Sequence, residues 1–96
     1  MTNTDPVQVT LVTAPACHFC EDAQATLAEL AQDCPLSLRE VAAESSEGQA
    51  LLHAHGAGMF PLVLVDGAFF SAGRLPRRKL ARLLHTGRSP ALAGGR

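Results

Sequence analysis

The stretch from Ala14 to Cys20, Ala-Pro-Ala-Cys-His-Phe-Cys, separates two different patterns of apolar residues. Before it, residues 7–13 are mostly apolar, as expected for a strand covered on both faces. After it, apolar side chains recur every three or four residues, which is typical of one face of a helix. These are Phe19, Ala23, Leu27, Leu30 and Ala31. We therefore expect a strand to end and a helix to begin here, with Cys17 at the helix N-cap.

The predicted N-cap position matters for the chemistry of Cys17. Its sulfur can accept hydrogen bonds from the amides of Phe19 and Cys20, and the positive end of the helix dipole favours thiolate over thiol. Such placement lowers the pKa of a cysteine, to about 3.5–7.5 in reactive Cys-x-x-Cys sites, although Glu21 and Asp22 oppose the shift. Cys20 lies one turn later, close enough to attack a mixed disulfide at Cys17. The pair therefore predicts dithiol exchange.

Length and composition limit the class of protein. The 96 residues are 47% hydrophobic, with four Phe and no Trp or Tyr, which predicts a single domain with a small aliphatic core. We expect this domain over residues 1–87 and a disordered tail over 88–96. The N-terminus lacks the basic and apolar stretches of a secretion signal, and no apolar run approaches the roughly 18 residues that span a bilayer. We therefore expect a soluble, cytoplasmic protein.

The three cysteines are too few for a disulfide scaffold, so a Cys-x-x-Cys in a reducing compartment indicates redox or metal chemistry. The flanking strand and helix favour redox chemistry. Cys34 ends the apolar stripe just before Pro35, and we expect it to be a buried small hydrophobic residue or, alternatively, a regulatory thiol. A metal or iron–sulfur module is a rival hypothesis, although the spacing matches no common zinc pattern. Its ligands would be Cys17 and Cys20 with His18, Cys34, His53 or His55.

Further apolar stretches follow the first helix, which we place at about residues 17–33. Residues 36–41 predict a strand, and a strand–helix–strand unit of this length calls for a parallel pair with a right-handed crossover. The unbroken branched-apolar run at 62–65 predicts a buried strand. Asp66-Gly67 suits a type I′ turn, so residues 68–71 should return antiparallel as the fourth strand.

Two more helices are expected. Ser46 and Gln49 have the spacing of a capping box, and Gly56 is suited to end the helix that they begin. Pro76 fits the first position of a third helix, which Gly87 would end.

Charge is segregated along the chain. Residues 1–73 hold all nine acids and one base, Arg39, whereas residues 74–96 hold the other seven of the eight bases and no acid. Such asymmetry indicates either an anionic partner for the C-terminal part or a solvated helix face.

The order of elements and two motifs resemble a glutaredoxin-like protein of the thioredoxin superfamily, over about residues 7–87. The motifs are Cys17-His18-Phe19-Cys20 and Phe60-Pro61, the latter where this superfamily has a cis-proline facing the cysteines. Thioredoxins have Trp where this chain has Ala16, and they bury an acid where it has Leu11, so both differences favour a glutaredoxin-like relative. The glutathione-binding Gly-Gly-x-x-Asp stretch of glutaredoxins is replaced by Ser-Ala-Gly-Arg-Leu at 71–75.

The resemblance implies an α/β thioredoxin-like fold, with a four-stranded mixed sheet flanked by three helices. It implies a thiol-disulfide oxidoreductase in which Cys17 attacks a disulfide and Cys20 resolves the mixed disulfide. A redox-inert interaction domain of the same fold is the second rival hypothesis. The substrate-binding residues that we expect are His18, Phe19, Phe60, Pro61, Gly73, Arg74 and Arg77.

The same resemblance bears on cofactors and partners. We expect no bound organic cofactor and no metal, with glutathione as a candidate reductant. The partner would be a disulfide-containing protein or glutathione, rather than nucleic acid or a membrane, and the protein would be a monomer. Arg74, with Arg77 or Arg78, is expected to form an anion-recognition edge beside the cysteines, because helix starts and arginines both attract carboxylates.

Overall fold

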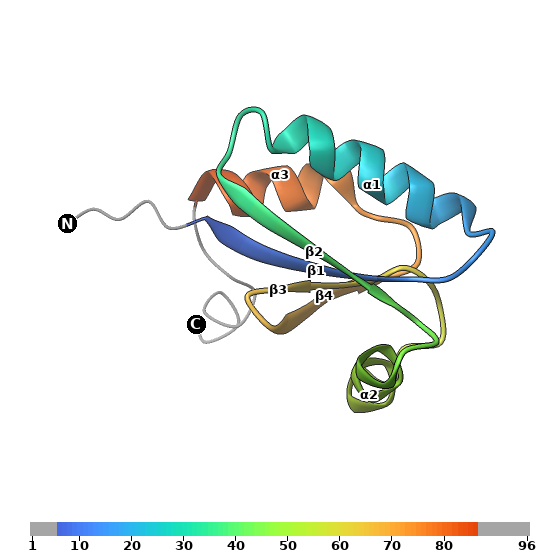
Figure 1. The fold of residues 1–96 in the computed structure, drawn as a ribbon. Coiled ribbons are helices and arrows are strands. Elements are labelled where there is room, and N and C mark those ends of the chain that lie inside the picture. Colours follow the sequence, from blue (N-terminus) through green and yellow to red (C-terminus); the bar gives the residue numbers. More distant parts are fainter. Residues whose placement is uncertain (1–5, 87–96) are drawn as a thin grey trace.

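The computed structural model describes residues 6–86 (Figure 1). Its elements are β1 Val7–Thr13, α1 His18–Leu30, β2 Leu36–Ala42, α2 Ser46–His55, β3 Leu62–Val65, β4 Ala68–Ala72 and α3 Arg77–Thr86. The predicted tail at 88–96 and the predicted helix end at Gly87 lie outside the described residues. Within those residues, no helix has both the length and the apolar character that crossing a membrane requires.

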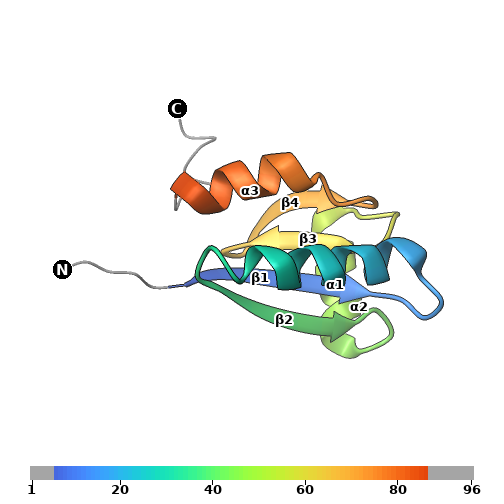
Figure 2. The same cartoon turned by 90° about the horizontal axis from the view of Figure 1, so that it is seen from above.

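The strands form one mixed sheet in the order β2-β1-β3-β4. β1 and β2 are parallel, whereas the β1–β3 and β3–β4 pairs are antiparallel. Helices α1 and α3 lie side by side on one face of the sheet, and α2 lies on the other (Figures 1 and 2). The predicted four-stranded mixed sheet with three helices is therefore confirmed.

Both faces of the central strands are buried, which explains why β1 and β3 are apolar without alternation. On the face covered by α1 and α3, Val9 and Leu11 pack with Leu27 and Leu80. On the opposite face, Val12 belongs to a second cluster that includes the partly buried leucines of α2. The two cores hold both helix layers against the strand that leads directly to the cysteines.

The β3–β4 hairpin has the predicted Asp-Gly turn. Asp66 has φ 50° and Gly67 has φ 83°, as a type I′ turn requires. Asp66 tolerates this conformation while its Oδ1 accepts a hydrogen bond of 3.0 Å from the amide of Gln8. An irregularity at Val63/Leu64 interrupts the register, and β4 extends to Ala72, one residue beyond the predicted strand.

The ends of the helices differ from the prediction by one to three residues. α1 ends at Leu30 rather than Asp33, because the amides of Gln32 and Asp33 bond to carbonyls three residues back instead of four, which closes the helix with a tighter turn. The N-cap of α2 is Ser45 rather than Ser46, with its Oγ accepting from the amide of Gly48 at 3.0 Å.

The side chain of Gln49 therefore forms no capping box. It donates instead to the carbonyl of Ala43 at 2.6 Å, which ties the start of α2 to the chain that follows β2. Gly56 ends α2 in the left-handed conformation, with φ 59°, as predicted. α3 begins one residue after Pro76, whose carbonyl accepts from the amide of Leu80 at 3.0 Å.

Candidate active site

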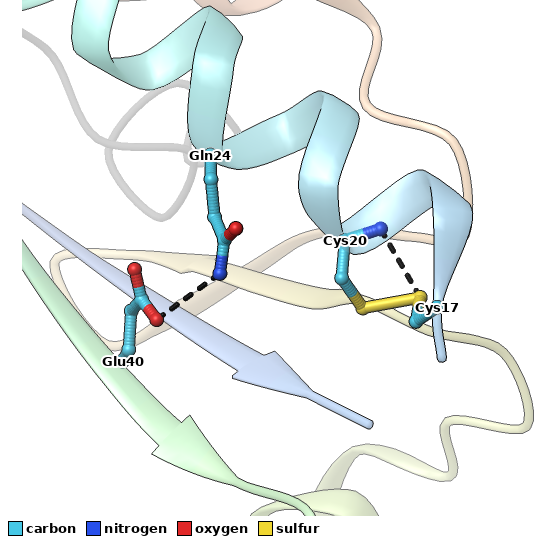
Figure 3. Close-up of a disulfide and its surroundings, with 4 residues drawn as sticks. All are labelled: Cys17, Cys20, Gln24 and Glu40. Atoms are coloured by element: carbon cyan, nitrogen blue, oxygen red, sulfur yellow. Dashed lines mark hydrogen bonds between the residues drawn. A yellow bond between two sulfur atoms is a disulfide. The ribbon is translucent and has the colours of Figure 1, made fainter. Parts of the chain in front are cut away.

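Cys17 and Cys20 are joined by a disulfide at the start of α1, with their Cα atoms 5.1 Å apart (Figure 3). Cys17 is the N-cap, as predicted, and its Sγ accepts a hydrogen bond of 3.1 Å from the amide of Cys20. The predicted second bond, from the amide of Phe19, does not form. Ala16, just before the cap, has φ 54° and turns the chain from β1 into the helix.

The two sulfurs differ in accessibility. Cys20 is 3% exposed because it lies on the inward face of the first helical turn, whereas Cys17 is half-buried. A molecule approaching from solvent therefore meets Cys17 first. His18 and Phe19, between them, are exposed, and Phe19 keeps 41% of its surface accessible.

The loop before β3 and the loop after β4 meet at the same end of the molecule as the cysteines (Figure 1). The peptide bond between Phe60 and Pro61 is cis, as the resemblance predicts. The carbonyl of Pro61 accepts a hydrogen bond of 3.0 Å from the amide of Gly73, which joins the two loops. Gly73 has φ 93°, and a Cβ there would lie 3.3 Å from the Cε of Met59, so this position requires glycine.

Met59 is a site residue that sequence reasoning missed. Its side chain is 57% exposed and covers Gly73, next to the half-buried Phe60. Its position two residues before Pro61 is the signal that could have identified it. Met59 and Phe60 add apolar surface to the loop that leads into β3.

The two arginines that we expected to act together, Arg74 and Arg77, have different surroundings. Arg74 is exposed and follows Gly73 directly. Arg77 instead forms an ion pair of 2.6 Å with Glu29 of α1. Glu29 lies nine residues after Cys20, about 13 Å along the helix at about 1.5 Å per residue. An acid distant in sequence thus neutralises Arg77, although residues 74–96 contain no acid.

Two polar contacts around α1 join residues far apart in the sequence. Gln24 donates to Glu40 of β2 at 3.1 Å, one helical turn beyond Cys20 (Figure 3). Cys34 is buried, as predicted, but its Sγ lies 3.8 Å from Nδ1 and 4.0 Å from Nε2 of His85. Sequence reasoning missed His85 because 51 residues separate it from Cys34.

The predicted alternative ligands for a metal do not gather in the part of the chain that the structure describes. Residues 6–86 contain no cluster of three or more His, Cys, Asp or Glu side chains able to hold a metal ion. His53 is exposed at the end of α2, and His55 lies with its ring centroid 6.3 Å from that of Phe69. Within residues 6–86, the two cysteines therefore have no third candidate metal ligand beside them.

Comparison with known proteins identifies the fold. No protein-family model matches the chain, and no curated protein sequence matches it either. Among solved structures, a thioredoxin-like protein from Clostridium perfringens matches with a TM-score of 0.68 and 12% identity, over 88% of this chain and 73% of the other. A mutant thioredoxin from Halobacterium salinarum matches with a TM-score of 0.62 and 21% identity, over 85% of this chain and 74% of the other.

Chlamydomonas reinhardtii thioredoxin f2 also matches, with a TM-score of 0.62 and 15% identity, over 93% of this chain and 85% of the other. At these identities the comparison establishes architecture and not activity. The strand order, the helices on both faces and these structural matches show that the chain is a protein of the thioredoxin fold.

Proposed function

We propose that this protein is a thiol-disulfide oxidoreductase that reduces disulfides through Cys17 and Cys20. The observation that carries the proposal is the unequal burial of the two joined sulfurs at the start of α1. An accessible cysteine at a helix N-cap with a buried partner one turn later is the arrangement that sequential dithiol exchange needs.

In the proposed reaction, the reduced protein supplies two electrons. The Cys17 thiolate attacks one sulfur of the substrate disulfide, so that a mixed disulfide forms and the other substrate sulfur leaves as a thiolate. The Cys20 thiolate then attacks Sγ of Cys17, and the second substrate sulfur leaves. The substrate takes up two protons and becomes a dithiol, while the protein is oxidised to the Cys17–Cys20 disulfide.

The environment of Cys17 supports its assignment as the attacking group. When the protein is reduced, the amide of Cys20 and the positive end of the α1 dipole both stabilise the thiolate. We therefore expect the pKa of Cys17 to lie below the usual thiol value. Glu21 and Asp22, both exposed in the following turn, reduce this effect without a direct contact to the sulfur.

Substrate contacts are proposed on three segments at the cysteine end of the molecule. His18 and Phe19 are exposed between the cysteines, and Phe60 with Pro61 leads into β3. Gly73 and Arg74 form the third segment, together with the newly found Met59. We leave Arg77 out of this set because its guanidinium pairs with Glu29.

A glutaredoxin-like role, with glutathione as the reductant that restores the dithiol, is the finer form of the proposal. It is supported by Ala16 and Leu11, which stand where thioredoxins have Trp and a buried acid. The substrate would be a disulfide-bearing protein or glutathione itself. We further propose that the protein is cytoplasmic, because reductants of this kind operate where thiols are kept reduced. We also propose that it is a monomer. In this proposal no bound cofactor, nucleic acid or membrane takes part.

The decisive experiment measures turnover of a disulfide substrate with glutathione and its reductase, and separately with thioredoxin reductase. We expect Cys17→Ser to abolish turnover and Cys20→Ser to accumulate mixed disulfides, which mass spectrometry would detect. Faster alkylation of Cys20 than of Cys17 would refute the assigned roles. Absence of turnover with either donor would favour a redox-inert domain, and one tightly held metal per chain, lost in Cys17→Ser, would favour a metal module.

A further inference from the structure

The outward side of α3 and the loop before it carry three arginines that form no ion pair within residues 6–86. Arg74, Arg78 and Arg82 are exposed, and the ion pairs of the described residues involve only Arg39 and Arg77. Residues four apart share a helix face, so Arg78 and Arg82 lie on one side of α3. Arg74 precedes them by the same interval. We call these three residues the arginine row.

The other two cations of this segment are engaged with the body of the protein. Arg77 pairs with Glu29, and Nζ of Lys79 lies 5.5 Å from the ring centroid of Phe70. Residues 74–79 also line an open groove of about 620 Å³ at the start of α3. The arginine row therefore carries positive charge that is not paired within residues 6–86, and two of its members, Arg74 and Arg78, border this groove.

The row leads away from the disulfide. The loop between β4 and α3 lies at the cysteine end of the molecule, and α3 then runs beside α1 away from that end (Figures 1 and 2). From Arg78 to Arg82 the distance along the axis is about 6 Å, at about 1.5 Å per residue. A polypeptide substrate continues beyond its own disulfide, so a segment of it can extend from Cys17 along the row at up to about 3.3–3.6 Å per residue.

The neighbouring helix restricts how a charged partner can lie. Near its start, α1 carries the exposed acids Glu21 and Asp22, and the turn after α1 carries Asp33. The layer formed by α1 and α3 is thus acidic along one helix and basic along the other. An acidic segment is attracted to α3 and repelled from α1, so it should lie along α3 and not along α1.

We propose that the arginine row binds an acidic segment of a disulfide-bearing protein substrate, which extends along α3 from a disulfide placed at Cys17. This proposal deepens the oxidoreductase function and rests on it for its catalytic consequence. Exposed ion pairs contribute little individually, so the main effect is on the rate of encounter. Electrostatic steering raises association rates by roughly 10-fold to 10³-fold and weakens as ionic strength rises.

The test compares two synthetic peptides that each contain one disulfide, followed by a run of glutamates or by the same number of glutamines. The measured quantity is the ratio of their rates of reduction by the full chain. We expect wild type to prefer the glutamate peptide on the order of tenfold at low salt. The preference should vanish near 1 M salt, where the screening length is about 3 Å. The double variant Arg78→Ala/Arg82→Ala, which keeps Arg74, should lose about two thirds of the preference on a logarithmic scale at low salt, if the three row residues contribute equally.

Arg39→Ala is the matched control for the single variant Arg82→Ala. It removes one exposed arginine from the opposite face, where Arg39 pairs with Glu47 of α2. The net charge changes equally, so Arg39→Ala should keep the glutamate preference while Arg82→Ala reduces it by about a third on a logarithmic scale, if the three row residues contribute equally. Equal losses in the two variants would overturn the proposal, because the effect would then be one of net charge.

A second measurement is independent of exchange. Binding of a labelled glutamate peptide without cysteines is measured by fluorescence anisotropy on the variant Cys17→Ser/Cys20→Ser. Salt-sensitive binding that is weakened in Arg78→Ala/Arg82→Ala supports the arginine row as a binding surface even if the protein turns over no disulfide. Three results would overturn the proposal. They are equal binding of the glutamate and glutamine peptides, tighter binding of duplex DNA than of the glutamate peptide, and salt-sensitive self-association of the protein that is lost when the row arginines are replaced.

Discussion

The double role of Cys17, as helix cap and as proposed nucleophile, can be separated by comparing serine with alanine at this position. The structure has the Sγ accepting from the amide of Cys20, one of the four amides that a helix start leaves without an internal partner. Serine keeps an acceptor there, whereas alanine removes it. Both changes remove the reactive sulfur, so they should be equal in activity and unequal in stability.

The expected difference follows from the single hydrogen bond that is lost. Replacing a serine N-cap by alanine costs about 1 kcal/mol, within a range of about 0.5–2. The comparison is made in a Cys20→Ser background under reducing conditions, so that neither protein has a disulfide at this position. With a urea m-value of about 2 kcal/mol per molar, the midpoint of the alanine variant should fall by about 0.5 M.

Circular dichroism during urea titration measures the two midpoints. Equal midpoints for Cys17→Ser and Cys17→Ala would refute the argument that an acceptor at this position stabilises the helix start. The hydrogen bond from the Cys20 amide would then no longer support a stabilised Cys17 thiolate, because the same amide is invoked for the helix start and for the thiolate. Only the helix dipole would remain as a reason. A folded but inactive Cys17→Ser would in turn show that the loss of exchange is chemical and not due to unfolding.

Three further predictions test the surroundings of the site. Ser71→Ala should raise the free energy of unfolding by about 1 kcal/mol, because the Ser71 hydroxyl is buried without a partner among the described residues; a lower urea midpoint would contradict this. Gly48→Ala should lower the free energy of unfolding by about 1–3 kcal/mol, since the added Cβ would overlap the Ala42 carbonyl oxygen. Gly58→Ala is the control and should leave the free energy of unfolding unchanged, because the space around Gly58 is open. Treatment with a chelator should leave turnover unchanged, as assayed before and after dialysis, because a closed zinc site needs four ligands and residues 6–86 bring no third ligand to Cys17 and Cys20. Lost activity that zinc restores would count against the exchange mechanism.

The elements that could be predicted from the sequence are those determined by neighbouring residues. The apolar run of β1 and the Asp66-Gly67 turn depend on backbone preferences within a few positions, and both occur where they were expected. The cis bond at Pro61 was predicted from the resemblance alone, since only about 5–6% of X–Pro bonds in folded proteins are cis. Helix ends were less accurate, because Ser45 and Ser46 are both competent caps.

The contacts that could not be predicted join elements distant in sequence. The separation of charge along the chain shows that the bases after residue 73 have no acid nearby in sequence, but the packing of α3 beside α1 brings Arg77 to Glu29. The same packing brings His85 to Cys34. A one-dimensional charge pattern cannot distinguish the arginine that faces the neighbouring helix from those that face solvent, because that choice depends on the rotation of α3 about its axis.

The spacing of the two cysteines brings together a sulfur for attack on the substrate, at Cys17, and a sulfur for resolution of the mixed disulfide, at Cys20. Three residues advance about 300° around a helix axis, so Cys20 returns to within about 60° of Cys17 while rising one turn. The two sulfurs can therefore bond to each other, although Cys17 stands outside the helix as its cap and Cys20 inside it against the sheet. One residue fewer between them would advance only about 200° and place the second sulfur on the opposite side of the axis. Proximity thus follows from the spacing and unequal burial from the position of Cys17 as the cap, and together they provide an accessible sulfur for attack and a protected one for resolution.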